Sequence, residues 1–187
     1  FAMIEWSPAY RQALDLNGAV IKVYATTSAT FNSAIDSDAP ATPERVLAAV
    51  RACPVPVVAA IEGACVGGGL ELALAADLRI AVRGARLGAP VGRLGFPFAR
   101  RELADLRACV GRDVAFELLV EGRLLDADEA CSKGLVTRAV PAGSLDAEVD
   151  ATCERIVAGS PLAARLNKAN LASGPLPPDD YRWRIQL

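Results

Sequence analysis

The sequence of 187 residues contains no histidine. Without an imidazole, the chain cannot form a Ser-His-Asp or Cys-His catalytic arrangement or a histidine-ligated zinc site. Acid–base chemistry would have to come from carboxylates, lysine, tyrosine or water. We expect no metal site.

The sequence is also poor in cysteine pairs and in long apolar runs. Its five cysteines are odd in number and form no Cys-x-x-Cys pair, so we expect reduced thiols that pack as small apolar side chains. No apolar run is long enough to span a bilayer, and no basic segment followed by an apolar one opens the chain. These features predict a cytoplasmic protein that does not bind a membrane.

Neither sign of charge is in large excess. Twenty Lys and Arg face 22 Asp and Glu, which gives a net charge of -2 and argues against nucleic acid as a partner. The stretch from 78 to 101 is an exception, because it has several arginines and no acid. Solvated surface and contacts with a phosphate both remain open for it. Hydrophobic residues make up 52% of the chain, enough for a sizeable core.

The most informative stretch runs from 56 to 77. Residues 57–61 have the length and β-branched content of a buried strand, Gly67-Gly68-Gly69 permits a tight turn, and residues 70–76 are strong helix formers. Unpaired N–H groups at such a helix start suit a developing negative charge. Glu71 returns to nearly the same helix face as Gly68, so a carboxylate base and an oxyanion donor could act on one small molecule. A merely close-packed turn with an ordinary first-turn acid is the alternative.

Elsewhere, strand patterns alternate with helix patterns, which predicts an α/β fold with a predominantly helical C-terminal part. The segment 26–38 is small, polar and loop-like. The expected strands are 19–25, 57–61, 78–82 and 135–140, and the expected helices are 7–16, 43–52, 70–76, 99–109, 111–120, 126–133, 144–158 and 160–171.

Residues 56 to 82 resemble the signature of the crotonase family of enoyl-CoA hydratases and isomerases. The shared features are the Pro-x-Val-Ala-x-Ile-x-Gly run, the Gly-Gly-Gly-x-Glu-Leu turn and the Ala-x-Asp that follows. The similarity extends over about 19–171. It implies a spiral of ββα units over residues 1–140 and a C-terminal helical trimerisation region over 141–187. It also implies a coenzyme A thioester as substrate, with no permanently bound cofactor.

The resemblance also implies functional residues. In the family, two backbone N–H groups hold the thioester oxygen while an enolate forms, and the matching positions here are Gly68 and Ile35. Ala34 stands where the family has glycine, which could distort this loop. The other residues that the resemblance places in the site are Glu71 as the acid–base residue and Ser33, Asp36, Gly67 and Lys168 as contacts with the coenzyme A thioester.

One departure from the family pattern concerns the second carboxylate. Hydratases of the family carry a glutamate directly after the proline of Gly-x-Pro-Glu, where this chain has Pro90-Val91. Losing one acid–base partner typically costs ~10²- to 10⁴-fold, so efficient two-glutamate hydration is not expected. The following turn resembles the methylmalonyl-CoA decarboxylase branch, but Ile35 and Phe98 replace that branch's histidine and tyrosine.

Three hypotheses follow. The leading one is an acyl-CoA enzyme of the hydratase/isomerase type, forming a homotrimer or hexamer, in which Glu71 is the single acid–base residue. The others are a decarboxylase of a malonyl-CoA-type thioester and a non-catalytic subunit that binds an acyl thioester or a partner. The family's opening β-hairpin and its Asn-Arg-Pro segment are not found, so we expect the N-terminal part to be incomplete.

Overall fold

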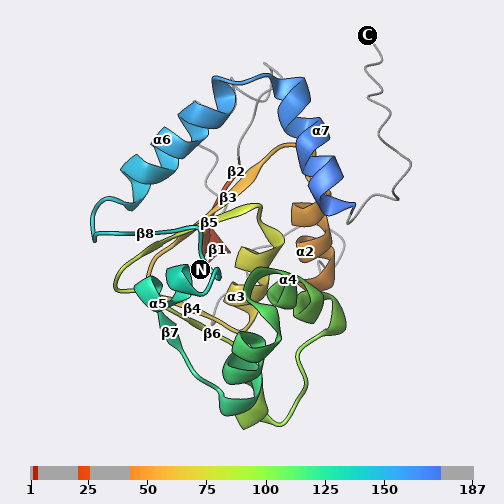
Figure 1. Cartoon of the computed structure of the whole chain (residues 1–187), viewed down its shortest axis with the longest axis vertical. Helices are drawn as coiled ribbons and strands as arrows, with labels where there is room; N and C mark the ends of the chain where they lie inside the picture. Colours follow the sequence, from red (N-terminus) through yellow and green to blue (C-terminus); the bar gives the residue numbers. More distant parts are fainter. Residues whose placement is uncertain (1, 4–20, 26–42, 174–187) are drawn as a thin grey trace.

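The computed structural model describes residues 2–3, 21–25 and 43–173. Two sheets form its centre (Figure 1). The larger sheet has the order β1-β2-β3-β5-β8 and the smaller has the order β4-β6-β7. The strands of the larger sheet are β1 (Ala2–Met3), β2 (Ile21–Ala25), β3 (Val57–Ile61), β5 (Leu78–Val82) and β8 (Arg138–Val140). Those of the smaller sheet are β4 (Ala64–Val66), β6 (Arg86–Gly88) and β7 (Leu125–Asp126).

Two successive segments of the chain repeat one pattern of strand, strand and helix. The first contributes β3 to the larger sheet and β4 to the smaller, and then forms α3 (Gly68–Ala75). The second does the same with β5 and β6 before η2 (Val91–Leu94) and α4 (Arg100–Phe116). Parallel pairing of β3 with β5 and of β4 with β6 stacks the two segments in register. This is the expected spiral of ββα units.

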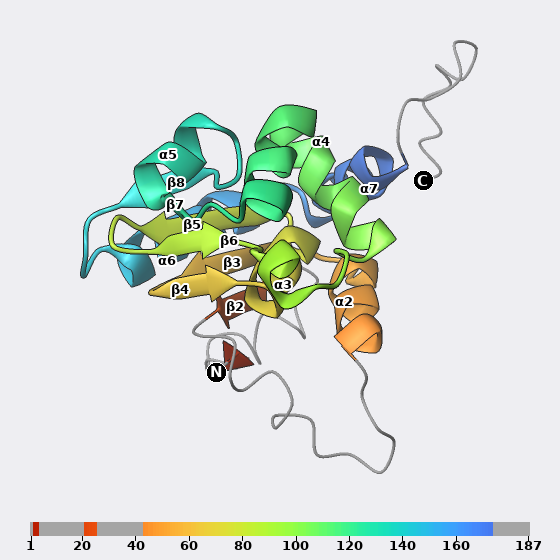
Figure 2. The ribbon, with the colours of Figure 1, turned by 90° about the horizontal axis from the view of Figure 1, so that it is seen from below.

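The core lies on β3 and its neighbours. All five residues of β3 are buried, as a strand with a parallel partner on each side requires. Apolar side chains of α3 and β5 continue this core, including Leu70 and Ile80, which are fully buried. Figure 2 shows the helices arranged around the two sheets. The central stretch is therefore held rigidly from both sides.

The remaining helices mostly follow the predicted pattern. Their bounds are α2 (Pro43–Ala52), η3 (Glu117–Glu121), α5 (Ala127–Ser132), α6 (Leu145–Val157) and α7 (Pro161–Ala172). Asp126 and Ser160 cap α5 and α7 through their side chains, accepting hydrogen bonds from Glu129 N and Ala163 N. The expected break between helices near 110 is present as a non-helical Gly111 inside α4. The helix expected over 7–16 and the loop over 26–38 lie outside the described residues.

Four short strands, β1, β4, β6 and β7, were not predicted, and the strand expected over 135–140 begins only at Arg138. Strands of two or three residues are too short to show an alternating pattern. Helices α6 and α7 are the last elements described, and α6 packs against β3 and β5. The division of the chain at residue 140 remains a prediction.

Candidate functional site

The glycine turn between β4 and α3 has a backbone shape that favours glycine. Gly67 has φ 58° and ψ -120°, a left-handed region that other residues rarely adopt. Its N–H donates to the Gly88 carbonyl at 3.0 Å, which extends the β4–β6 pairing by one bond. The turn is thus fastened to the next ββα segment, and Gly67 reverses the chain into α3.

The first N–H groups of α3 are candidate donors to a ligand. The earliest backbone bond of the helix is Glu71 N–H to the Gly67 carbonyl, at 3.0 Å. Among the residues that the structure describes, none accepts a hydrogen bond from the Gly68 or Gly69 N–H. A Cβ atom added at Gly67, Gly68 or Gly69 would meet no described atom within 4 Å. Within the described part of the chain, two backbone donors at the positive end of a helix therefore lack an acceptor, and such donors suit an anionic oxygen.

Glu71 lies in the first turn of the same helix, three residues beyond Gly68. Its side chain is half-buried, and no described residue forms a hydrogen bond with its carboxylate. Burial raises the pKa of Glu71, the nearby Glu102 and Glu44 charges raise it further, and Arg51 lowers it. A carboxylate with a raised pKa accepts a proton more readily, as a general base requires.

The segment after β6 is the next neighbour of the turn, because the Gly67–Gly88 bond holds the two together. Val91 follows at the start of η2 with a buried apolar side chain, and Phe98 is also buried. Neither side chain can carry a proton. No acid occurs from 78 to 101, so this segment supplies no second carboxylate.

A second carboxylate instead approaches α3 from α4. Glu102, in the first turn of α4, is buried and pairs with Arg51 of α2 at 2.9 Å. The same guanidinium pairs with Asp105 at 2.8 Å. Sequence reasoning did not identify this cluster. The three-residue spacing of Glu102 and Asp105 in the sequence indicates that they share a helix face. Their partner, Arg51, is some fifty positions earlier, and only the tertiary fold brings it beside them.

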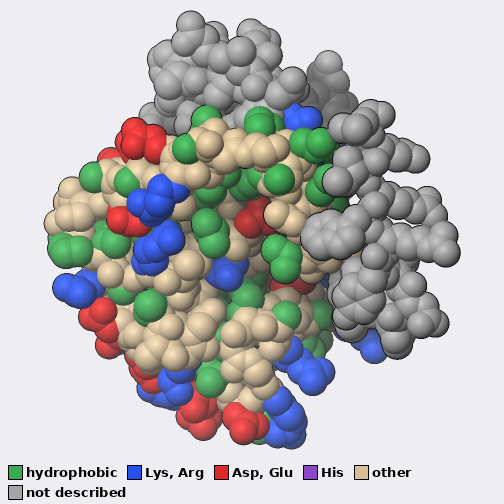
Figure 3. All heavy atoms as spheres, turned by 45° about the horizontal axis from the view of Figure 1, so that its top comes forward, with side chains coloured by type: hydrophobic (Ala, Val, Ile, Leu, Met, Phe, Trp, Pro, Cys, Tyr) green, Lys and Arg blue, Asp and Glu red, His purple; other side chains and the backbone are tan. Residues whose placement is uncertain are grey.

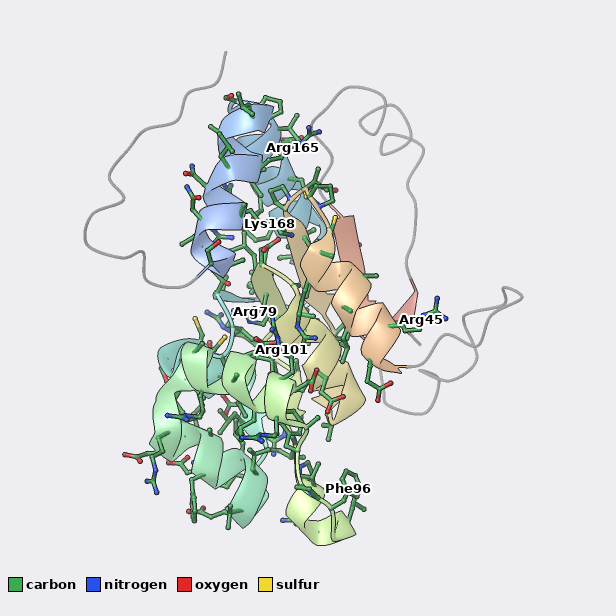
Figure 4. The ribbon with its side chains drawn as sticks, turned by 90° about the vertical axis from the view of Figure 1, so that its right-hand side faces the viewer. Arg45, Arg79, Phe96, Arg101, Arg165 and Lys168 are labelled. Atoms are coloured by element: carbon green, nitrogen blue, oxygen red, sulfur yellow. The ribbon has the colours of Figure 1, made fainter. Side chains whose placement is uncertain are left out.

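Lys168 of α7 has partners inside the chain. Its Nζ donates to Asp77 Oδ2 at 2.7 Å and to the Val55 carbonyl at 2.8 Å, and Asp77 Oδ2 also accepts from the Val57 N–H. Figure 4 shows Lys168 on the side of α7 that faces the sheet. The structure thus places it away from the glycine turn, as an anchor between α7 and the start of β3. Its contact with coenzyme A remains a prediction.

Two arginines of the segment 78–101 have partners within the chain. Arg79 is buried and donates to the carbonyls of Leu135 and Ala76, and Arg83 pairs with Asp128 at the surface. Figure 3 shows acidic and basic side chains interspersed over one face, with no large area of one sign among the described residues visible there. Arg83 therefore agrees with the solvated surface that was one of the two alternatives, whereas the buried Arg79 fits neither of them.

Several expectations can be followed only in part. Ser33, Ile35 and Asp36 lie outside the described residues, so only the Gly68, Gly67 and Glu71 part of the predicted site is seen.

All five cysteines are free, as expected, and burial raises the pKa of Cys65 to about 12, which leaves its thiol unreactive. Across 43–173 and the two short N-terminal strands, no helix is long and apolar enough to cross a membrane. The same part of the chain contains no cluster of metal-binding side chains.

Comparison with known proteins extends this picture. A family model described as enoyl-CoA hydratase/isomerase matches residues 24–175. The chain is 37% identical over 131 residues to a crotonyl-CoA hydratase of Syntrophomonas wolfei, covering 70% of this chain and 50% of that protein. It spans about half the length of the curated relatives that it matches.

Solved structures agree with the sequence comparison. An enoyl-CoA hydratase/carnithine racemase from Magnetospirillum magneticum is 47% identical with a TM-score of 0.68, covering 72% of this chain and 52% of that one. A monofunctional enoyl CoA isomerase from M. smegmatis is 29% identical with a TM-score of 0.69, covering 83% of this chain and 88% of the other. With its ββα spiral and its glycine turn, this chain belongs to the enoyl-CoA hydratase/isomerase family and has the crotonase fold.

Proposed function

We propose that this protein is an acyl-CoA enzyme in which the Gly68 N–H stabilises a thioester enolate and Glu71 transfers the proton. One observation carries the proposal: a backbone donor with no acceptor among the described residues lies one helical turn from a half-buried carboxylate that no described residue binds. A thioester gives up its α-proton only if the oxygen that becomes negative is stabilised. Both requirements are met on one helix start.

The second donor in this proposal is the Ile35 N–H. A backbone donor does not depend on its own side chain, so isoleucine can serve there as well as a smaller residue. Gly67, Ser33 and Asp36 would contact the thioester around this oxyanion hole, and Lys168 would need to leave Asp77 to reach a coenzyme A phosphate. Coenzyme A enters and leaves as part of the substrate.

Val91 stands where hydratases of the family carry a second glutamate, so Glu71 would be the single carboxylate that transfers protons. In a double-bond isomerisation, Glu71 takes the proton from C2, the electron pair moves into the enolate, and the same carboxylate returns the proton to C4. Hydration needs a second group to handle water, and the segment from 86 to 98 supplies none. Isomerisation is therefore the reaction that we favour within the hydratase/isomerase type.

Decarboxylation of a malonyl-CoA-type thioester is the second candidate. Loss of CO2 leaves the same enolate, which the oxyanion hole would stabilise without a proton acceptor. Val91 and Phe98 are buried and apolar, and an apolar surface beside the substrate carboxylate would favour this candidate, because it disfavours that negative charge relative to neutral CO2. Substitution of Glu71 separates the two, since only the isomerase needs its carboxylate for the first step.

The experiment measures Δ3–Δ2 enoyl-CoA isomerase, hydratase and malonyl-CoA-type decarboxylase activities of the full protein and of its Glu71→Gln variant. We expect isomerase activity in the unmodified protein and a loss of about 10²- to 10⁴-fold in Glu71→Gln. Full activity in that variant would contradict the assignment of Glu71.

Binding of acetoacetyl-CoA, whose enolate imitates the intermediate, tests the oxyanion hole separately by calorimetry. Glu71→Gln should retain binding, because the backbone donors remain. Gly68→Pro, which removes one donor, should lose at least tenfold in affinity while its circular dichroism spectrum stays that of a folded protein. Equal affinity in the proline variant would overturn the role of Gly68.

A further inference from the structure

Helix α3 packs against α2 and against α4, and each of these neighbours brings a charged residue toward Glu71. Figures 2 and 4 show the three helices as neighbours. Arg51 lies in the last turn of α2, and Glu102 lies in the first turn of α4. The two chain segments are far apart in sequence, so their meeting beside the Glu71 helix is a product of the fold.

The contact between Arg51 and Glu102 is well defined. Arg51 Nη2 donates to Glu102 Oε1 at 2.9 Å, and the two side chains are 18% and 8% exposed. Arg51 Nε donates at 2.9 Å to Asp105 Oδ2, so the guanidinium is held by both carboxylates of α4. A charge pair that is largely out of water has a fixed geometry and is weakly screened by salt. Glu102 is thereby kept in place beside Arg51.

Three charged groups act on Glu71, and they come from both flanking helices. Glu102 of α4 exerts the largest of these effects and raises the pKa of Glu71, Arg51 of α2 lowers it, and Glu44 of α2 raises it. On the strand side, β4 contributes the buried thiol of Cys65, which is neutral. Strand β2 also packs against α3 and carries Lys22 and Tyr24, whose side chains are outside the described part.

We propose that Glu102, anchored by Arg51, is a positioning residue that sets the protonation state in which Glu71 works. Glu102 repels a negative charge on Glu71 and makes its carboxylate a stronger proton acceptor. Arg51 limits this repulsion and keeps Glu102 from moving away. This role rests on the function proposed above.

The direct test follows the side-chain carboxyl ¹³C resonance of Glu71 against pH in the full protein, with the signal assigned by its absence in Glu71→Gln. Glu102→Gln keeps the shape of the side chain and removes its charge, so the Glu71 midpoint should fall to lower pH. Arg51→Met removes the opposing positive charge, so the midpoint should rise. Glu102→Asp restores a carboxylate and should return the midpoint toward that of the unmodified protein.

Asp113→Asn is the matched control, because it removes one negative charge from the same helix at a fully exposed carboxylate. We expect this variant to leave the Glu71 midpoint unchanged. A Glu71 midpoint that does not move in folded Glu102→Gln, or that moves in the same direction in Glu102→Gln and Arg51→Met, would overturn the proposal. A purely structural role predicts loss of stability without these opposite shifts.

The same variants are then compared in the pH dependence of kcat/KM. If Glu71 is the base, the acid limb of this profile should move to lower pH in Glu102→Gln and to higher pH in Arg51→Met. The resonance titration needs no substrate, so the two ideas can fail separately. If the Glu71 midpoint shifts in opposite directions in the two variants but activity is the same in Glu71→Gln, the proposed function is contradicted and this inference stands. If activity is lost in Glu71→Gln but the Glu71 midpoint is the same in Glu102→Gln, only this inference is contradicted.

Discussion

Gly88 is the residue of the site region with the least room around it. A Cβ atom there would lie 2.7 Å from the Arg123 carbonyl oxygen and 2.7 Å from Leu124 Cδ2. Its own carbonyl holds the Gly67 N–H, so a shift at this point would be transmitted to the glycine turn. The Arg123 carbonyl oxygen is a backbone atom and cannot turn aside as a side chain could, so the added methyl group would be overpacked.

We therefore predict that Gly88→Ala destabilises the protein by about 1–3 kcal/mol, the usual range for overpacking a buried position. Gly84→Ala is the control, because an added Cβ there meets nothing within 4 Å and φ lies outside the left-handed region. Its stability should change by less than about 0.5 kcal/mol. Urea unfolding of both variants measures the difference, and equal stabilities would contradict the close approach at Gly88.

Polar contacts help to hold helix α7 on the rest of the molecule. None of its residues, all of which are described, is buried, so apolar packing contributes little to its position. Lys168 instead connects it to Asp77 and to the Val55 carbonyl, with a side chain that is 13% exposed. The resemblance had implied a contact with coenzyme A for this residue. Its contact with Asp77 depends on the position of α7 beside the start of β3, which only the tertiary structure shows.

Replacing Lys168 by Met should loosen α7 and cost about 1–3 kcal/mol, the range for hydrogen bonds to charged groups. We expect faster amide hydrogen exchange across Pro161–Ala172 in this variant. Arg83→Gln, which breaks an ion pair whose side chains are 59% and 63% exposed, is the control and should change stability by less than about 1 kcal/mol. Unchanged exchange in α7 would show that the helix is held by other contacts.

For the whole molecule, the main open question is how the chain assembles. Several large apolar side chains of the last two helices are exposed, with Leu162 at 61% and Leu166 at 51%. These two leucines are four residues apart and so share one face of α7, whereas Lys168 points to the sheet from another. An exposed apolar row of this kind marks a surface for association. We propose that it contributes to the trimer or hexamer that the resemblance implies.

The double substitution Leu162→Glu and Leu166→Glu should lower the mass of the assembly without unfolding the subunit, because both side chains are already exposed. Sedimentation velocity measures that mass, and circular dichroism checks the fold. Asn167→Glu adds a charge to α7 outside the leucine row and should leave the mass unchanged. An assembly of undiminished mass in the double variant would place the interface elsewhere.

The sequence by itself determined the central part of this protein. The apolar run before the glycines is buried as β3, the residues after them form α3, and Glu71 follows Gly68 at the predicted spacing. These features depend on neighbours within a few positions, where strand length, glycine and helix propensity act directly. The capped starts of α5 and α7 were predictable for the same reason.

The tertiary structure alone decided which distant residues meet. The short strands β4, β6 and β7 have no pattern of their own and exist because their backbone groups pair with each other. Arg51 reaches Glu102, and Lys168 reaches Asp77, across long stretches of chain. Local propensity carries no information about such pairs, because they form only after the helices are packed. The charges that act on Glu71 therefore could not be inferred before the fold was known.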